Sequence, residues 1–172
     1  VEAVERLIDD NTCCLFLEIM TNPQLEVVDV RALTSIAHQH GIPVIADTTL
    51  IPFTQFSAKD LGIDLEVVSS TKYISGGATS LGGLVIDYGT FPSIGKRLLN
   101  EMLFNLGAYM TPQVAYMQTL GLETLDVRYR AQAGNALELA QRLRTLKPIH
   151  KVNYVGLEDN PYHQLAVSQY GE

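Results

Sequence analysis

A lysine and an aspartate each follow a short apolar run, where opposite charges could meet in one site. Asp47 closes the run PVIAD at 43–47, and Lys72 follows the run LEVV at 65–68 within the sequence SSTKY. In open α/β sheets, ligands bind beyond the carboxyl ends of the strands. If the two runs form neighbouring strands, we expect a carboxylate and an amine to project into the same crevice.

This pair of groups suits the chemistry of pyridoxal 5'-phosphate (PLP). A lysine amine can form a Schiff base with the cofactor aldehyde, and an incoming amino acid displaces it by exchange. A carboxylate against the pyridine nitrogen keeps that nitrogen protonated, so the ring withdraws electrons from the substrate. The hydroxyls of Ser69 and Thr71, which flank Lys72, could receive the cofactor phosphate together with N–H groups of the loop.

Spacing alone leaves a simpler interpretation open. A lysine after a strand is usually a solvated surface residue, and an aspartate there often caps a turn. The glycine-rich segment 75–83 has neither the spacing nor the lysine of a P-loop, so nucleotide phosphate binding is disfavoured. His150 and His163 show no metal-ligand spacing with cysteines or carboxylates, so we expect no metal site.

The elements that must position these residues follow an α/β pattern. Short apolar runs without polar alternation are typical of strands that are buried on both faces. Four such runs occur, at 13–18, 43–47, 65–68 and 82–87. We therefore expect an α/β fold with a mostly parallel sheet, right-handed crossovers and helices packed on each side.

The segment 29–40 between the first two runs is predicted to be a helix. Asp29 suits its N-cap, Gly41 suits its C-cap, and Pro43 prevents continuation. One helical face carries the apolar residues that should contact the sheet, namely Val30, Leu33, Ile36 and Ala37.

The second half of the sequence is predicted to be helical from about residue 94 to residue 146. We expect breaks near Gly107 and Gly121. After the second break, apolar residues recur every three or four positions, which indicates one long amphipathic helix. We expect Arg128 on that helix to serve in packing or salt bridges.

A β-like stretch at 149–156 follows the helical region, and it suggests the entry to another domain. We therefore divide the chain into three parts. They are the central part of a cofactor-binding domain at 1–121, a connecting helix at 122–147, and the start of a C-terminal domain at 148–172.

Composition excludes several classes of partner. The chain has 172 residues, with 47% hydrophobic residues, 18% charged residues and a net charge of −7. This acidic balance disfavours nucleic acid, and no apolar run approaches the length of a membrane span. The adjacent Cys13 and Cys14 suit neither a disulfide nor a shared metal ion, and they are typical of a reducing compartment. We therefore expect a cytoplasmic protein.

Five motifs, in order along nearly the whole chain, resemble the Cys/Met metabolism PLP-dependent enzymes. They are EIMTNPQLEVVDV, ADTTLIPF, SSTKYISGGATSLGGLVID, GLETLDVR and VNYVGLEDNPYHQLA. The resemblance implies the PLP-dependent transferase fold of the aspartate-aminotransferase type, known as fold type I. It also implies PLP as the cofactor, an amino acid as the substrate, and a homo-oligomer, either a dimer or a tetramer.

The resemblance also implies roles for individual residues. Lys72 would be the Schiff-base lysine and the base that moves protons among the substrate carbons and the cofactor. Asp47 would pair with the pyridinium nitrogen, and Asn22 would lie near the phenolic oxygen of the cofactor and the substrate carboxylate.

Three hydroxyl residues complete the implied site. Thr49 would lie close to the cofactor ring, and Ser69 and Thr71 would hold its phosphate. The sequence departs from the family pattern at Thr48, where asparagine is usual beside the aspartate. Neither the lysine nor the aspartate is affected by this departure, but it leaves the fine substrate specificity open.

Within the family, the segment GGATSLGGLVIDYGTF is most similar to the sulfhydrylases. That similarity implies γ-replacement, in which O-acetyl-L-homoserine loses acetate and sulfide adds to give homocysteine. A cystathionine lyase, a methionine lyase or a cystathionine γ-synthase is the alternative. Because family members run beyond both ends of this sequence, we expect it to be a central fragment that is inactive alone, and an inert scaffold is the non-enzymatic alternative.

Overall fold

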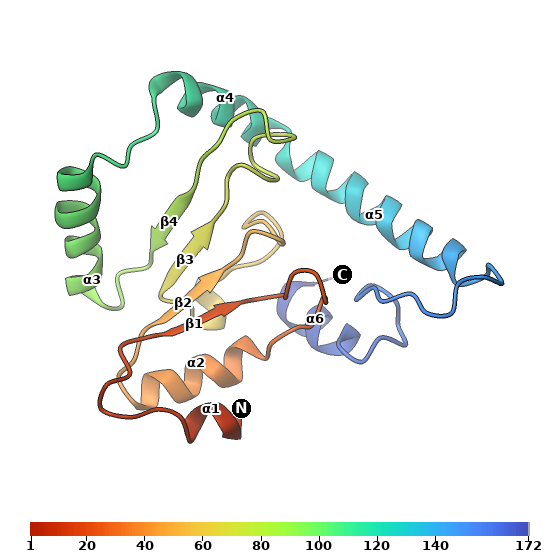
Figure 1. The fold of residues 1–172 in the computed structure, drawn as a ribbon, viewed down its shortest axis with the longest axis horizontal. Helices are drawn as coiled ribbons and strands as arrows, with labels where there is room; N and C mark the ends of the chain where they lie inside the picture. Colours follow the sequence, from red (N-terminus) through yellow and green to blue (C-terminus); the bar gives the residue numbers. More distant parts are fainter. Residues whose placement is uncertain (172) are drawn as a thin grey trace.

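A four-stranded sheet forms the centre of the computed structural model, which describes residues 1–171. The strand order follows the chain, and the first three strands are parallel while the fourth is antiparallel to the third. The strands are β1 (Leu15–Glu18), β2 (Val44–Asp47), β3 (Leu65–Val68) and β4 (Leu84–Asp87). Each lies inside one of the four apolar runs, so the prediction of a mostly parallel α/β sheet is confirmed (Figure 1).

Helices surround the sheet, and α5 runs past the carboxyl ends of its parallel strands (Figure 1). The α-helices are α1 (Glu2–Glu5), α2 (Val30–Gln39), α3 (Pro92–Arg97), α4 (Pro112–Glu123), α5 (Leu125–Leu143) and α6 (His163–Tyr170). A 3-10 turn, η1 (Lys59–Leu61), precedes β3, and a π-helix, η2 (Leu98–Phe104), continues α3. None of the helices in residues 1–171 combines the length and the apolar character needed to cross a membrane.

Helix α2 forms as the sequence predicts. The Asp29 carboxylate accepts a hydrogen bond from the Ala32 N–H at 3.0 Å, which satisfies one of the unpartnered donors in the first turn. Gly41 follows the C-cap with a φ of +68°, a conformation that glycine adopts without steric cost. The face predicted to contact the sheet is buried, including Val30, Leu33, Ile36 and Ala37.

One face of the sheet packs on α2, and within residues 1–171 the other face is only partly covered. Leu17, Val44 and Ala46 point into the core with α2, whereas the side chains of Phe16 and Val85 on the opposite face are 61% and 56% exposed. The expectation of strands buried on both faces therefore holds for β3, where Leu65 and Glu66 on opposite faces are 2% and 0% exposed, and it is wrong for the outer strands β1 and β4. An apolar run indicates that both faces of a strand carry side chains that can be buried, but it does not show which element covers each face.

Helix α6 closes the same core from the far end of the chain. The Tyr170 hydroxyl donates to the Ile19 carbonyl at 3.1 Å. The Gln169 side chain accepts from the Val30 N–H at 2.7 Å and donates to the Val28 carbonyl at 2.9 Å. Because Val30 N–H belongs to the first turn of α2, this glutamine satisfies a donor that α2 cannot pair internally. The domain division at residue 148 stays a prediction.

Two local expectations for the second half need correction, and one is confirmed. The chain breaks at Gly107, which has a φ of +66°, as predicted. Helix α4 instead runs through Gly121 and ends at Glu123, since this glycine serves close packing rather than helix termination. The stretch 149–156 contains no strand, because its side chains rather than a backbone ladder hold it, as when Asn153 donates to the Gln24 carbonyl at 2.6 Å.

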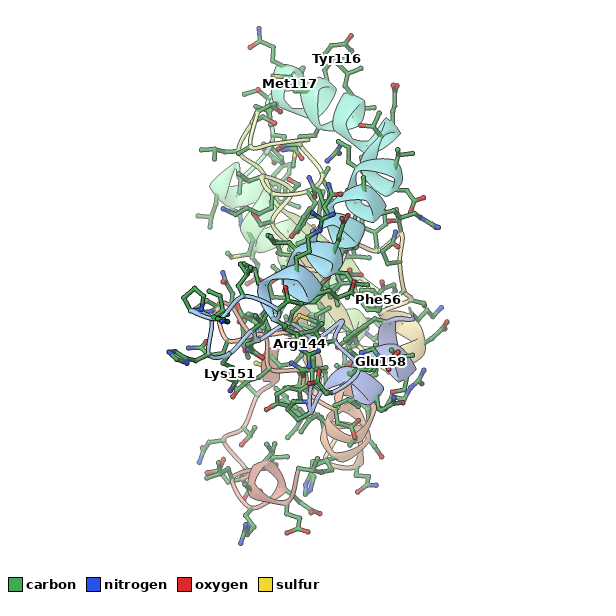
Figure 2. The ribbon with its side chains drawn as sticks, turned by 90° about the vertical axis from the view of Figure 1, so that its right-hand side faces the viewer. Phe56, Tyr116, Met117, Arg144, Lys151 and Glu158 are labelled. Atoms are coloured by element: carbon green, nitrogen blue, oxygen red, sulfur yellow. The ribbon has the colours of Figure 1, made fainter. Side chains whose placement is uncertain are left out.

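Residues 92–123, which we call the helical arm, extend from the sheet with many exposed apolar side chains. Neither α3 nor η2 contributes a buried residue. Phe104 is 78% exposed, Leu106 is also exposed, and Tyr116 and Met117 project from α4 (Figure 2). This arm therefore leaves more apolar surface open than the scattered exposed side chains of a typical monomer.

A buried acid in β3 is a feature that its apolar run concealed. Glu66 is 0% exposed, and its two carboxylate oxygens accept hydrogen bonds from the Thr48 hydroxyl at 2.5 Å and the Tyr88 hydroxyl at 2.7 Å. Burial, and next the hydrogen bond with Glu66, raises the pKa of the Tyr88 hydroxyl, so it stays protonated as a donor. The three side chains form a polar network within the sheet core.

We expect Glu66→Ala to lower the free energy of unfolding by about 3 kcal/mol, because the buried Thr48 hydroxyl and the half-buried Tyr88 hydroxyl lose their acceptor. Glu138→Ala is the matched control, since the Glu138 side chain is exposed and only pairs with Arg142 on the surface. That change should stay within about 0.5 kcal/mol. Urea unfolding followed by circular dichroism measures both, and equal stability of the two variants would contradict a structural role for the network.

Candidate active site

The carboxyl ends of β1, β2 and β3 meet at one edge of the sheet. Asp47 is the Cα partner of Glu18 in β1 and of Val67 in β3. The prediction that the runs before Asp47 and Lys72 form neighbouring strands is therefore confirmed. Because the three strands are parallel, the loops that carry Asn22, Asp47 and Lys72 all leave from this edge.

Asp47 is half-buried and lies on the open face of the sheet, opposite the side that packs on α2. One carboxylate oxygen, Oδ1, accepts from the Thr49 N–H at 2.8 Å. Oδ2 has no hydrogen-bond partner among residues 1–171. The carboxylate is thus oriented by its own turn, and it retains an oxygen that can bind a protonated ring nitrogen.

Thr49 links the aspartate loop to the lysine loop. Its N–H holds Asp47, and its hydroxyl oxygen accepts from the Ser69 N–H at 2.8 Å. The Thr48 N–H continues the backbone pairing by donating to the Val67 carbonyl at 3.0 Å. These bonds fix the two loops against each other immediately beyond the strands.

Lys72 lies in a tight turn whose following residues are buried. The Lys72 N–H donates to the Ser69 carbonyl at 3.2 Å, and the Ser75 N–H donates to the Ser70 carbonyl at 2.9 Å. Ile74 and Ser75 are buried, whereas the Lys72 side chain is exposed and forms no ion pair within the described chain. An anchored backbone with a projecting amine is the arrangement that a nucleophilic lysine needs.

The two hydroxyls predicted to hold the phosphate differ in availability. The Thr71 hydroxyl donates to the Gly82 carbonyl at 3.1 Å and accepts from the Gly82 N–H at 2.9 Å. Its proton is therefore already used to fasten the glycine-rich segment to the lysine loop. The Ser69 hydroxyl has no such bond among residues 1–171, so it is the better donor for a phosphate oxygen.

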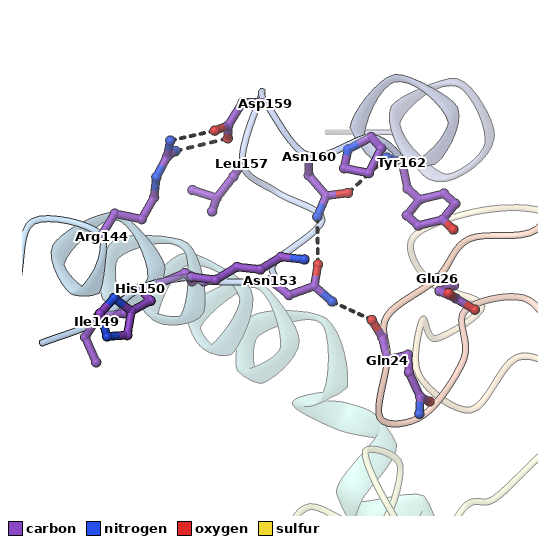
Figure 3. A pocket seen from close by; sticks show the side chains of 13 residues that line it. Gln24, Glu26, Arg144, Ile149, His150, Asn153, Leu157, Asp159, Asn160 and Tyr162 are labelled. Carbon is purple, nitrogen blue, oxygen red and sulfur yellow. Dashed lines mark hydrogen bonds and ion pairs between the residues drawn. The ribbon is translucent and has the colours of Figure 1, made fainter.

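Asn22 lies in the loop after β1, and its side chain is exposed. The Glu18 carboxylate accepts from the Asn22 N–H at 3.3 Å. Two residues further on, the Gln24 carbonyl accepts from Asn153, which in turn accepts from Asn160 at 3.1 Å (Figure 3). The C-terminal segment thus helps to hold the loop in which Asn22 is predicted to bind the substrate.

Two cavities lie beside this edge, and neither is lined by Asp47 or Lys72. One, of about 530 Å³, lies around Asn153 (Figure 3). The other, of about 1240 Å³, lies between α5 and the C-terminal segment, with Leu50, Tyr73 and Tyr129 in its wall. The amine and the carboxylate of the candidate site therefore lie at the strand ends, outside the walls of both cavities.

Sequence reasoning overlooked Glu18 and underestimated Arg128. Glu18 closes β1 as Asp47 closes β2, so an acid at the end of an apolar run was the available signal. The structure confirms Arg128 as a packing residue, but its guanidinium donates to the Tyr73 carbonyl at 2.9 Å, next to the lysine. No local pattern indicates that contact, because the two residues are 55 positions apart.

Comparison with known proteins agrees with this geometry. A family model described as Cys/Met metabolism PLP-dependent enzyme matches residues 1–172. The chain is 37% identical over 170 residues to the canavanine γ-lyase of Pseudomonas canavaninivorans, an alignment that covers 99% of this chain and 42% of that protein.

Solved structures show the same similarity. The O-acetylhomoserine sulfhydrylase of Wolinella succinogenes matches with a TM-score of 0.86 and 40% identity, over 98% of this chain and 53% of the other. An O-acetylhomoserine (thiol)-lyase of Campylobacter jejuni matches with a TM-score of 0.91 and 31% identity, over 98% of this chain and 48% of the other. The Campylobacter structure contains N'-pyridoxyl-lysine-5'-monophosphate.

The chain therefore spans about half the length of the relatives that it matches. Its strand order, the turn that carries Lys72 and the carboxylate of Asp47 are the features expected of a PLP-dependent enzyme of fold type I. With the family match extending over the whole sequence, the chain belongs to the Cys/Met metabolism PLP-dependent enzyme family.

Proposed function

We propose that the protein carrying residues 1–172 uses PLP to convert O-acetyl-L-homoserine and sulfide into homocysteine by γ-replacement. The observation that carries the proposal is the parallel pairing of β2 with β3, after which Asp47 and Lys72 leave from the same edge. When they follow neighbouring parallel strands, a carboxylate suits the ring nitrogen of PLP and an amine suits its aldehyde.

Each residue has a role in this proposal. When bound, PLP supplies an electron sink for the substrate carbon next to the amino group. The Lys72 amine would hold the cofactor through its aldehyde and would carry protons between substrate carbons. The Asp47 carboxylate keeps a proton on the ring nitrogen by a charge-assisted hydrogen bond. Thr49 orients that carboxylate through its N–H, and the Ser69 hydroxyl donates to the phosphate.

Thr71 and Asn22 complete the proposed site. Thr71 fastens the glycine-rich segment at Gly82, and its hydroxyl proton is used in that bond. Its hydroxyl oxygen can still accept one hydrogen bond, so it binds the phosphate only through a protonated phosphate oxygen or a bridging water. Asn22 has an exposed side-chain amide, which can donate to the substrate carboxylate and to the phenolic oxygen of the cofactor.

A γ-lyase is the second candidate, because one relative with 37% identity is a canavanine γ-lyase. The sulfhydrylase is favoured because the structure with 40% identity is an O-acetylhomoserine sulfhydrylase. Both reactions use the same lysine and aspartate, so the residues of this chain do not separate them.

The covalent assignment is tested by adding PLP to the purified chain, recording the visible spectrum, reducing with borohydride and mapping the labelled peptide. We expect a pyridoxyl group on Lys72 and its loss in Lys72→Ala, while Lys59→Ala retains it. A label spread equally over the other lysines would contradict the role of Lys72.

The same titration tests the aspartate. Asp47→Asn should weaken PLP binding about ten- to a hundredfold, since a charge-assisted hydrogen bond contributes about 1.5–3 kcal/mol. Asp87→Asn is the matched control, because Asp87 also closes a strand and accepts from an N–H two residues later, that of Gly89, at 2.8 Å. It pairs with Leu65 at the other end of β3, so its replacement should leave PLP binding unchanged.

The reaction class is tested by supplying O-acetyl-L-homoserine to the protein that carries this chain, with and without sulfide. A sulfhydrylase forms homocysteine only when sulfide is present. A γ-lyase releases ammonia and a keto acid from its substrate without sulfide. Release of ammonia and a keto acid without sulfide would therefore favour the γ-lyase over the sulfhydrylase.

We further propose that the protein assembles as a homo-oligomer through the helical arm. The support is the exposed apolar surface of that arm, on which Phe104 and Leu106 lie close in the chain. A second copy of the arm is a self-complementary partner for such a surface.

We expect light scattering to give a molecular mass of at least two chains, and Phe104→Glu to reduce it to one. Glu101→Gln, in the same π-helix but already polar, should leave the assembly unchanged. A wild-type protein that is monomeric at micromolar concentration would contradict the proposed assembly.

A further inference from the structure

Two adjacent residues near the start of α5 contact both loops of the proposed site. Arg128 donates from Nη1 to the Tyr73 carbonyl at 2.9 Å, and Tyr73 is the residue after Lys72. Tyr129 donates from its hydroxyl to the Leu50 carbonyl at 3.2 Å, and Leu50 lies three residues after Asp47. One helix is thus bonded to the backbone beside the amine and to the backbone beside the carboxylate.

Arg128 uses its guanidinium on three acceptors at once. Besides the Tyr73 carbonyl, it donates to the Gly121 carbonyl at 2.7 Å and to the Thr124 hydroxyl at 3.0 Å. The Gly121 carbonyl belongs to the last turn of α4, where carbonyl groups lack helical partners and a cation is stabilising. The planar arrangement of donors joins the end of α4 to the turn that carries Lys72.

Helix α4 leaves this turn little room to move. A Cβ atom added at Gly121 would lie 2.0 Å from the Ile74 carbonyl oxygen, so the helix backbone itself packs against the turn. Ile74 and Ser75 are buried at that contact, while the Lys72 side chain is exposed. The backbone position of Lys72 is therefore set by α4 and α5 as well as by β3.

Tyr129 extends the restraint to the aspartate loop. Its ring packs edge-to-face on Tyr73, with 5.3 Å between the ring centroids. Burial, and then the neighbouring Tyr73 and Tyr154, raises the pKa of the Tyr129 hydroxyl, which therefore stays protonated and donates to the Leu50 carbonyl. Packing and hydrogen bonding through this one side chain connect the two loops, in addition to the bond from the Ser69 N–H to the Thr49 hydroxyl.

We propose that Arg128 and Tyr129 are positioning residues, which set the separation of the Lys72 amine from the Asp47 carboxylate and so adapt the site to PLP. This inference rests on the proposed function, because PLP is the ligand whose aldehyde and ring nitrogen must both be reached. It makes the start of α5 part of the site through its bonds to the backbone beside the lysine and the aspartate.

The test compares Arg128→Gln with Arg142→Gln in the protein that carries this chain. Arg142 lies on the same helix and pairs only with the exposed Glu138, so it controls for losing an arginine from α5. PLP affinity is measured by visible absorbance, and the fraction of label on Lys72 is measured after borohydride reduction. Circular dichroism sets a temperature at which every variant is folded.

We expect Arg128→Gln to weaken PLP binding by about tenfold or more and to move label from Lys72 to other lysines. Arg142→Gln should match the wild type. Arg128→Lys should give an intermediate affinity, because an ammonium group keeps the charge but not the fork of donors. Tyr129→Phe keeps the ring contact, loses the bond to Leu50, and should weaken binding by about threefold or more.

The inference is overturned if Arg128→Gln and Tyr129→Phe both keep the PLP affinity and the Lys72 labelling of the wild type. A lowered thermal midpoint alone would show that the two residues contribute only to stability. If Arg128→Gln does not fold, Tyr129→Phe decides alone. If the wild-type protein that carries this chain shows no preference for labelling Lys72, the proposed function and this inference are both overturned. A labelled wild type with unaffected variants would overturn the inference only.

Discussion

The register in which β2 pairs with β3 is the constraint on which the candidate site depends. Successive side chains of a strand point to opposite faces, so a slip of one residue would turn Asp47 into the core. The network of Glu66 with Thr48 and Tyr88 opposes such a slip, because it satisfies a buried carboxylate only in the observed alignment. The hydrogen bonds of Glu66 on the core face thus keep the Asp47 side chain on the opposite face of the sheet.

Beyond the strands, the two loops are held from two sides. The Thr49 hydroxyl joins them directly through the Ser69 N–H, and Arg128 and Tyr129 hold them from α5. Restraint of both kinds matters for PLP, because its aldehyde and its ring nitrogen lie at fixed positions on one rigid ring. A lysine and an aspartate on independently moving loops would meet both positions only part of the time.

Much of this arrangement was readable from the sequence, for physical reasons that differ between elements. Helix α2 was predictable because Asp29, Gly41 and the spaced apolar residues act locally. Gly121 was misread as a helix break, because a glycine that permits close packing has the same sequence signature as one that ends a helix. The stretch 149–156 was misread as β-like, because its alternating apolar residues do not show whether another strand pairs with it, and none does within residues 1–171.

The sequence by itself determined the strands, the helix that covers them, and the candidacy of Lys72 and Asp47, since these depend on residues close together in the chain. Only the tertiary structure decided that Glu66 is buried, that Phe16 and Val85 on the opposite face stay exposed in residues 1–171, and that α5 reaches both loops. Those outcomes depend on contacts such as Tyr129 with Leu50, which are 79 positions apart. Periodicity records which face a residue occupies, whereas the partner on that face is chosen by the packing of the whole chain.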